Sequence, residues 1–344
     1  MKAVVKYAPG AGNIDVREMK EPACGPGLVK VQVAFCGVCG TDLHVLHDTF
    51  RNYPPVILGH ECAGTVAEVG PGVNGVAVGD PVTVLGATAV TCGRCTYCRS
   101  GYFIFCPQRR GMGHGVDGAF ARYLVVRPDQ LYRLPDGMSL QAGALSEPFA
   151  AVVQAVTEIT QVRLGETAVV SGPGPIGLLC VKLLVAEGIN TIVAGTPADS
   201  DRLIAAKRFG AAHVVNVGEG GLGEAVRDVT RGVGADVAFE CSGHPDSVRG
   251  CLDSLRPMGR YTQVGICGRE IQFPMDQVFY KQLTVRGSIT YTAATWSRMM
   301  NIFAHSNLRL DDLVSTTLPI TDWQRAFDMV EDRSALKVLL YPVD

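Results

Sequence analysis

Strands and helices alternate regularly between residues 167 and 289, and this alternation constrains the fold more than any other feature of the chain. Residues 167–171 (TAVVS) have the composition of a fully buried strand, and residues 176–187 show helical apolar spacing. The pattern predicts a Rossmann-type α/β domain, with a doubly wound, parallel, six-stranded sheet. Its further strands are expected at residues 191–194, 212–217, 236–241, 260–265 and 283–289, and its further helices at residues 199–209, 222–230 and 245–255.

The turn between the first strand and the first helix reads GPGPIG and matches the G-x-G-x-x-G pattern. Gly172, Gly174 and Gly177 allow a tight turn and a close approach of a ligand to the backbone. With Pro175 and Ile176 they place the start of the helix, where free amides and the positive dipole end attract a pyrophosphate. An ordinary tight turn could contain the same glycines. The position between a strand and a helix favours a coenzyme site.

Dinucleotides bind at the carboxyl ends of the strands in such sheets, so the remaining coenzyme contacts are expected there. NAD-specific folds carry an acid at the tip of the second strand, where this chain has Thr196. Arg202 could accommodate the 2′-phosphate of NADP or face solvent, whereas Asp199 and Asp201 could repel that phosphate or bind the ribose of NAD. The sequence therefore predicts NAD or NADP without choosing between them. The expected coenzyme-binding residues beyond the glycine-rich turn are Thr196, Arg202, Val264, Gly265, Ile266, Ser288 and Ile289.

The first 150 residues consist of short β-rich runs separated by Gly and Pro. Runs at 29–33, 65–69 and 81–85 predict an antiparallel barrel or sandwich, with loops that carry the functional side chains. Beyond Ser288, two expected helices (293–305 and 321–330) and a strand (336–341) are too few for a separate core. We expect this tail to return to the N-terminal domain. The predicted domains are therefore residues 1–150 with 291–344, and residues 151–290.

Four cysteines are closely spaced in a loop rich in Gly, Thr and Arg. Cys92, Cys95, Cys98 and Cys106 follow C-x2-C-x2-C-x7-C, a spacing that lets four thiolates surround one tetrahedral Zn²⁺. An iron–sulfur cluster or a chance group of thiols is the alternative. A closed set of four sulfurs would make the site structural.

A second group of metal-binding side chains lies earlier in the chain. Cys39, His60 and Glu61 supply a thiolate, an imidazole and a carboxylate, the donor types that bind Zn²⁺ at an open, reactive site. Cysteine and histidine are also common core residues, so the spacing alone is weak evidence.

Composition excludes several classes of function. The net charge of −2 argues against nucleic acid and anionic membranes as partners. The chain has no apolar stretch long enough to span a bilayer, and its N-terminus lacks the apolar run of a signal peptide. Twelve cysteines without a signal peptide indicate reduced thiols and metal ligands, so a cytoplasmic protein is expected.

Taken together, these motifs resemble the zinc-containing medium-chain alcohol dehydrogenases, and within them the polyol (sorbitol or L-iditol-type) and threonine dehydrogenases. The resemblance implies a GroES-like, β-rich catalytic domain beside the coenzyme domain. It covers the whole chain in order. The matching stretches are CGVCGTDLH (36–44), GHECAGTVAEVG (59–70), the four cysteines, GALSEP (143–148), SGPGPIGLL (171–179), FECSG (239–243) and ALKVLLYP (335–342).

The resemblance implies two zinc ions per chain, one structural and one catalytic. Cys39 and His60 would bind the catalytic zinc, and Glu61 and Glu147 are each candidates for a further ligand, directly or through water. Thr41 resembles the hydroxyl that takes the proton of the substrate, and His44 resembles the outer relay to water. Asp42 is expected to orient His60, while Cys36 and Cys62 are expected to remain buried thiols.

The activity implied is zinc-dependent interconversion of a secondary alcohol (a polyol, sugar alcohol or cyclitol) and its ketone by hydride transfer to NAD(P). The arginine that sorbitol dehydrogenases carry near Thr290 and Tyr291 is missing, so the substrate need not be sorbitol. Dehydrogenases of the L-threonine or butanediol type, and a non-catalytic binding protein of the same fold, are the alternatives. The resemblance also implies a homodimer or homotetramer through the coenzyme domain, with residues 278–289 as the edge.

Overall fold

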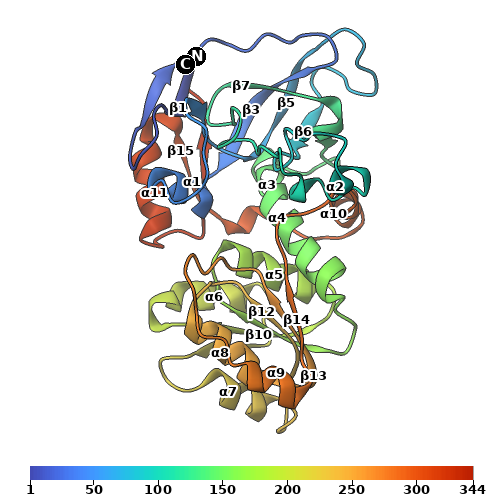
Figure 1. Cartoon of the computed structure of the whole chain (residues 1–344), viewed down its shortest axis with the longest axis vertical. Helices are drawn as coiled ribbons and strands as arrows, with labels where there is room; N and C mark the ends of the chain where they lie inside the picture. Colours follow the sequence, from blue (N-terminus) through green and yellow to red (C-terminus); the bar gives the residue numbers. More distant parts are fainter. Residues whose placement is uncertain (344) are drawn as a thin grey trace. The chain divides into compact units, whose positions relative to one another are not determined.

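The computed structural model describes residues 1–343 and divides the chain into two compact units. The first unit contains Met1–Pro148 together with the segment that starts at Thr292, and the second contains Phe149–Tyr291. Figure 1 shows the blue-to-green N-terminal segment and the red C-terminal segment in the same unit. Each unit has its own apolar core.

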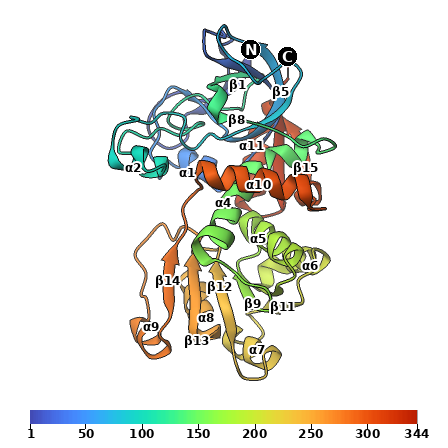
Figure 2. The ribbon, with the colours of Figure 1, turned by 90° about the vertical axis from the view of Figure 1, so that its right-hand side faces the viewer.

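The second unit is built on a six-stranded sheet in which all neighbouring strands are parallel. The order β11-β10-β9-β12-β13-β14 confirms the predicted doubly wound α/β fold. From β9 the chain adds β10 and β11 on one side of the sheet, and then adds β12, β13 and β14 on the other side. Figure 2 shows β12, β13 and β14 side by side, with β14 at the edge. The strands are β9 (Thr167–Ser171), β10 (Asn190–Gly195), β11 (His213–Asn216), β12 (Ala235–Glu240), β13 (Leu255–Gln263) and β14 (Thr284–Gly287).

The helices of this unit begin and end where local chemistry dictates. α5 starts at Pro175, whose fixed φ suits the first helical position, and the chain leaves it through Gly188 with φ of 71°. The helices are α5 (Pro175–Ala186), α6 (Ser200–Arg208), α7 (Leu222–Val229), α8 (Pro245–Ser254) and α9 (Met275–Lys281), with the π-helical segment Gln154–Thr160 and a 3₁₀ turn at Pro197–Asp199.

The first unit contains a mainly antiparallel sheet, with β1, β2 and β4 in a smaller sheet. β16 pairs with β3, so the C-terminal segment completes the N-terminal sheet. Buried side chains such as Val31, Phe120 and Leu340 fill the core between these strands and α11. The strands are β1 (Lys2–Lys6), β2 (Ile14–Glu18), β3 (Val29–Gly37), β4 (Val56–Ile57), β5 (Glu61–Val69), β6 (Pro81–Val84), β7 (Tyr123–Val126), β8 (Leu131–Arg133), β15 (Val314–Pro319) and β16 (Lys337–Tyr341).

Short helices join these strands and carry several of the polar side chains discussed below. They are α1 (Gly40–Leu46), α2 (Thr96–Arg99), α3 (Leu140–Ala144), α10 (Ala293–His305) and α11 (Trp323–Glu331), with 3₁₀ turns at Phe103–Phe105, Pro128–Gln130, Asp311–Leu313 and Ile320–Asp322. α4 (Ser146–Val153) runs from the first unit into the second. Among residues 1–343, no helix is both long and apolar enough to cross a bilayer.

Candidate metal centres and coenzyme site

Cys39, His60 and Glu61 come together in the first unit, although two different elements supply them. Their ligand atoms all lie within 4.8 Å of one another. Cys39 precedes α1, and His60 and Glu61 lie at the start of β5. The turn before His60 requires a glycine at position 59, because a Cβ at its φ of 89° would stand 2.5 Å from the ring of Phe120. A thiolate, an imidazole and a carboxylate within this distance fit one Zn²⁺ with an open position.

Asp42 connects the two elements that carry these ligands. Its Oδ2 accepts a hydrogen bond from the Cys39 amide at 2.9 Å, and its Oδ1 lies 3.6 Å from His60 Nδ1. Burial disfavours a proton on His60, but Asp42 and Cys39 together outweigh this effect and raise the pKa of His60 well above its ordinary value. Asp42 therefore turns Nδ1 toward itself and leaves Nε2 for a metal.

Lys337 forms an ion pair with Glu61 Oε2 inside the first unit. The two side chains are 4% and 1% exposed, and Lys337 Nζ also donates to the Val38 carbonyl at 2.9 Å. Burial lowers the pKa of Lys337, but Glu61, Cys39 and Asp42 together raise it by more, so the net shift is upward. The pair neutralises a carboxylate that would otherwise add a negative charge to the metal site.

Three further groups lie near these ligands. Burial raises the pKa of Cys36 well above its usual value and that of Cys62 to about 12, so both stay protonated thiols and poor metal ligands. Glu147 is outside the group of three side chains. It lies close enough for its charge to act on Cys62. Its role as a ligand remains a prediction.

Thr41 and His44 lie three residues apart on α1, which places them on one helical face. Thr41 Oγ1 is 3.7 Å from the sulfur of Cys39, so the hydroxyl lies beside the metal ligands. His44 is exposed, and its Nδ1 hydrogen-bonds Thr49 Oγ1 at 3.0 Å. A hydroxyl beside the metal ligands and an imidazole in contact with water are the two ends that a proton relay needs.

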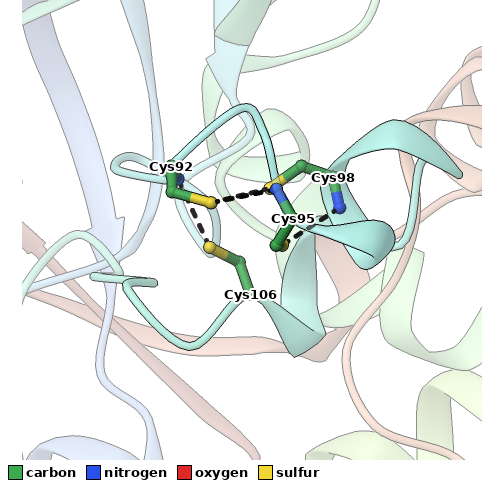
Figure 3. Close-up of side chains that lie close together, drawn as sticks. All are labelled: Cys92, Cys95, Cys98 and Cys106. Carbon is green, nitrogen blue, oxygen red and sulfur yellow. Dashed lines mark hydrogen bonds between the residues drawn. The ribbon is translucent and has the colours of Figure 1, made fainter.

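The four cysteines of the second cluster also come together, as Figure 3 shows. Cys92 Sγ and Cys98 Sγ are 3.9 Å apart, near the ~3.8 Å that Zn–S bonds of ~2.3 Å give in a tetrahedron. Amides point at the sulfurs: Cys95 donates to Cys92 at 3.3 Å, and Cys92 donates to Cys106 at 3.3 Å. Backbone N–H groups of Arg94 and Cys95 lower the pKa of Cys92 to about 6, which favours a thiolate.

In the second unit, Gly172 and Gly177 of the glycine-rich turn are tightly packed, whereas Gly174 has open space beside it. Gly172 has φ of 96°, and a Cβ there would stand 2.8 Å from Ser242. A Cβ on Gly177 would stand 2.0 Å from the Gly172 carbonyl, so α5 packs tightly on the turn. Gly174 is different: its nearest neighbour is Arg202 Nη1, 3.8 Å from the position of a Cβ. An open glycine before a helix start fits a bound pyrophosphate.

Asp199, an acid close to the tip of β10, is hydrogen-bonded to Thr196. Asp199 is buried, and its Oδ2 accepts hydrogen bonds from the amide and the hydroxyl of Thr196 at 3.0 and 2.7 Å. This carboxylate therefore caps the turn before α6. Arg202 is also largely buried and lies beside Gly174.

The remaining predicted coenzyme residues follow the carboxyl ends of the parallel strands β13 and β14. Val264, Gly265 and Ile266 come directly after β13, and Ser288 and Ile289 come directly after β14. The amides of Val264 and Gly265 both donate to the Glu240 carbonyl at 2.8 Å. The Ser288 amide donates to Gln263 at 2.9 Å, which joins the ends of β13 and β14.

Sequence reasoning missed the residues that hold these loops. The buried Glu240 accepts hydrogen bonds from Gly243, Ser247 and Gln263, which fixes the loop after β12. Lys337 was also missed. A single lysine within the apolar run of residues 335–342 is the feature that could have indicated it, since a lone charge in a buried strand needs a partner.

The chain is similar to known dehydrogenases over its whole length. A model of the alcohol dehydrogenase GroES-like domain matches residues 25–136, and a model of zinc-binding dehydrogenases matches residues 175–305. A sorbitol dehydrogenase of Halalkalibacterium halodurans is 37% identical over 100% of both chains. A D-arabitol-phosphate dehydrogenase of Enterococcus avium is 32% identical over 99% of this chain and 97% of its own. A zinc-binding dehydrogenase of Sinorhizobium meliloti 1021, solved bound to NADP, has a TM-score of 0.89 and 29% identity over 99% of each chain.

Proposed function

Because this chain belongs to the zinc-containing medium-chain alcohol dehydrogenases, we propose that it oxidises a secondary hydroxyl of a polyol to a ketone and catalyses the reverse reduction. Membership makes it a zinc-dependent NAD(P) oxidoreductase of the alcohol and polyol class. The observation that carries the proposed chemistry is the group of Cys39, His60 and Glu61, whose ligand atoms lie within 4.8 Å of one another.

The side chains around this group have distinct proposed roles. Cys39 and His60 would hold the zinc with Glu61 or Glu147. Bound zinc would polarise the substrate hydroxyl, and the nicotinamide would supply the hydride acceptor. Thr41 Oγ1 would take the hydroxyl proton, and His44, whose ring contacts water, would release it.

We propose a preference for NADP over NAD. The acid that NAD-specific folds place at this strand tip is replaced by Thr196, and the neighbouring carboxylate of Asp199 is bound to the backbone of the turn. Arg202 lies beside Gly174 and follows Asp199 by three residues, so it would supply a cation near the coenzyme phosphates.

A substrate panel tests the proposed activity. Purified protein with about two zinc ions per chain is incubated with polyols, cyclitols, L-threonine and butanediols, and reduction of NAD and NADP is followed by nicotinamide absorbance. We expect oxidation of at least one polyol with NADP, and its loss in Cys39→Ser protein that keeps the zinc of the four cysteines. Equal activity in parent and variant would refute the metal-dependent mechanism, and faster oxidation of threonine than of any polyol would change the substrate class.

A further inference from the structure

A pocket of about 250 Å³ lies in the first unit, and Cys106 of the four-cysteine group forms part of its lining. Its lining contains three arginines and no acidic residue among those that the structure describes. Its size is below that of pockets that enclose a drug-sized ligand, and suits one end of a small molecule. We call it the arginine pocket; it is lined by Phe50, Arg51, Tyr53, Cys106, Pro107, Arg109, Arg110 and His114.

The guanidinium groups are held in place by aromatic and backbone contacts. Arg110 lies over the ring of Tyr53, with 4.2 Å from its Cζ to the ring centroid, and Arg51 lies over the same ring at 5.0 Å. Arg109 Nη1 donates to the Ala87 carbonyl at 2.9 Å. Within residues 1–343, neither Arg51 nor Arg110 forms an ion pair with a carboxylate. Cations grouped in this way repel one another, and a bound anion would offset that repulsion.

The arginine pocket is adjacent to the loop that carries His60. The Tyr53 amide donates to the His114 carbonyl at 2.9 Å, and a Cβ on Gly113 would stand 2.7 Å from the Gly59 carbonyl. The pocket therefore lies beside the metal ligands within one unit of the fold.

We propose that the arginine pocket binds the phosphate of a phosphorylated polyol, so that the preferred substrate is a polyol phosphate. The proposal rests on the proposed function, and it names the substrate class of that same site. Guanidinium forks match the oxygens of a phosphate, and the positive charges of Arg51 and Arg110 suit a dianion better than the single charge of a carboxylate. On this proposal, the carbon chain of the substrate would extend from the pocket toward the metal ligands of the same unit.

Paired substrates test the proposal. We compare a pentitol with the same pentitol carrying a terminal phosphate, and include the corresponding aldonic acid as the carboxylate. In the parent enzyme we expect kcat/KM for the phosphate ester to exceed that for the pentitol by about tenfold or more. In Arg51→Gln/Arg110→Gln protein we expect kcat/KM to fall about 10- to 100-fold for the ester. For the pentitol it should change less than about threefold.

Arg133→Gln is the matched control, because Arg133 is an exposed arginine of the same unit, paired with Asp80 and Asp136 outside the pocket. It should leave both substrates unaffected. Calorimetric titration with inorganic phosphate gives a second readout that does not need activity. We expect the parent and the Arg133→Gln protein to bind phosphate, and the double variant to lose this binding.

The outcomes separate the two proposals. Equal kcat/KM for pentitol and ester in the parent, without phosphate binding, would overturn the phosphate site and leave the proposed function intact. Preference for the aldonic acid would also overturn it, in favour of a carboxylate substrate. Suppose that no alcohol is oxidised, but that phosphate binds to the parent and not to the double variant. This result would support the phosphate site and would refute the proposed function.

Discussion

A single lysine stabilises the buried carboxylate of Glu61. Both partners of the Lys337–Glu61 pair are almost fully buried, so removing the cation leaves a charge that water cannot reach. We predict that Lys337→Met lowers the free energy of unfolding by about 3–5 kcal/mol. Urea denaturation of zinc-free protein measures this loss without the contribution of the metal.

Lys30→Met is the matched control for this prediction. Lys30 also pairs with two glutamates, but Glu21 and Glu68 are 52% and 53% exposed and stay hydrated when the lysine is removed. We expect a loss of about 1 kcal/mol or less there. Similar losses in the two variants would show that burial of Glu61 does not set the effect.

His114 gives the stability of the fold a defined dependence on pH. Burial, and then the positive charges of His60 and Arg109, lower its pKa to about 4, whereas an unfolded histidine titrates near 6.5. Between these values the unfolded chain binds a proton that the folded chain does not. The contribution of His114 is therefore complete above pH 6.5 and is lost as the pH falls to 4, by about 3 kcal/mol in total. We predict that the unfolding free energy of His114→Asn protein declines less over this range than that of the parent, measured by urea titration. Parallel pH profiles would contradict the assignment.

Thr196 is the residue at which coenzyme choice can be reversed. An acid at this position would repel the 2′-phosphate of NADP and could accept hydrogen bonds from the ribose hydroxyls of NAD. We predict that Thr196→Asp weakens NADPH binding about tenfold or more and strengthens NADH binding, measured by nicotinamide fluorescence. Thr191→Ser, at the buried start of β10, is the control and should change neither affinity. A parent enzyme that binds NADH more tightly than NADPH would refute the proposed preference.

Sequence reasoning reached the donor types in both metal groups, and Asp42 as the partner of His60, but not Lys337 or the role of Asp199. Cys39, His60 and Glu61 are brought together as expected, because each carries a recognisable donor. The commitment of Asp199 to the turn before α6, and the burial of Lys337 against Glu61, depend on how distant segments pack. Local patterns carry no information of that kind.

At the scale of single elements, the loop with the four cysteines depends most on its metal. Tyr97, Tyr102 and Phe105 are about half exposed, so apolar burial contributes little to the folding of this loop. We predict that Cys95→Ser reduces the zinc content from about two ions per chain to about one and removes hydrogen-exchange protection in residues 90–110. The polyol activity should persist, because the other group of ligands is unchanged.

Cys24→Ser is the control for this loop, since Cys24 is a thiol outside both metal groups. Its zinc content and exchange protection should match those of the parent. Retention of both zinc ions by Cys95→Ser protein would show that Cys95 is not a ligand.

Element prediction succeeded where the apolar pattern was strong and failed where it was weak. The strand at 167–171 and the helix at 293–305 were predicted with the bounds that β9 and α10 have. α9 was missed because it has only seven residues and none of them is buried, so it shows no apolar face. β15 was missed because its alternation is weak: only Leu318 among its six residues is buried.

At the scale of the whole molecule, both edge strands of the six-stranded sheet expose a valine, and exposed aromatic side chains precede the β14 edge. β14 pairs only with β13, and Val285 on it is 41% exposed. Phe279 and Tyr280 on α9 precede this strand and are 74% and 79% exposed. An exposed edge strand with apolar neighbours tends to pair with another chain. We therefore predict that two copies associate through β14, as the homodimer or as part of the homotetramer that the family resemblance implies.

Charge on this edge should block the association. We predict that Val285→Lys protein elutes as a monomer in size-exclusion chromatography with light scattering, because a buried lysine at a strand-pairing edge opposes contact with a second copy. Val214→Lys is the matched control: Val214 is 40% exposed on β11, which forms the opposite edge of the same sheet. That variant should keep the mass of the parent, since the exposed aromatic side chains of α9 have no counterpart at Val214. A monomeric Val214→Lys protein beside an oligomeric Val285→Lys protein would assign the interface to β11, and a monomeric parent would exclude both.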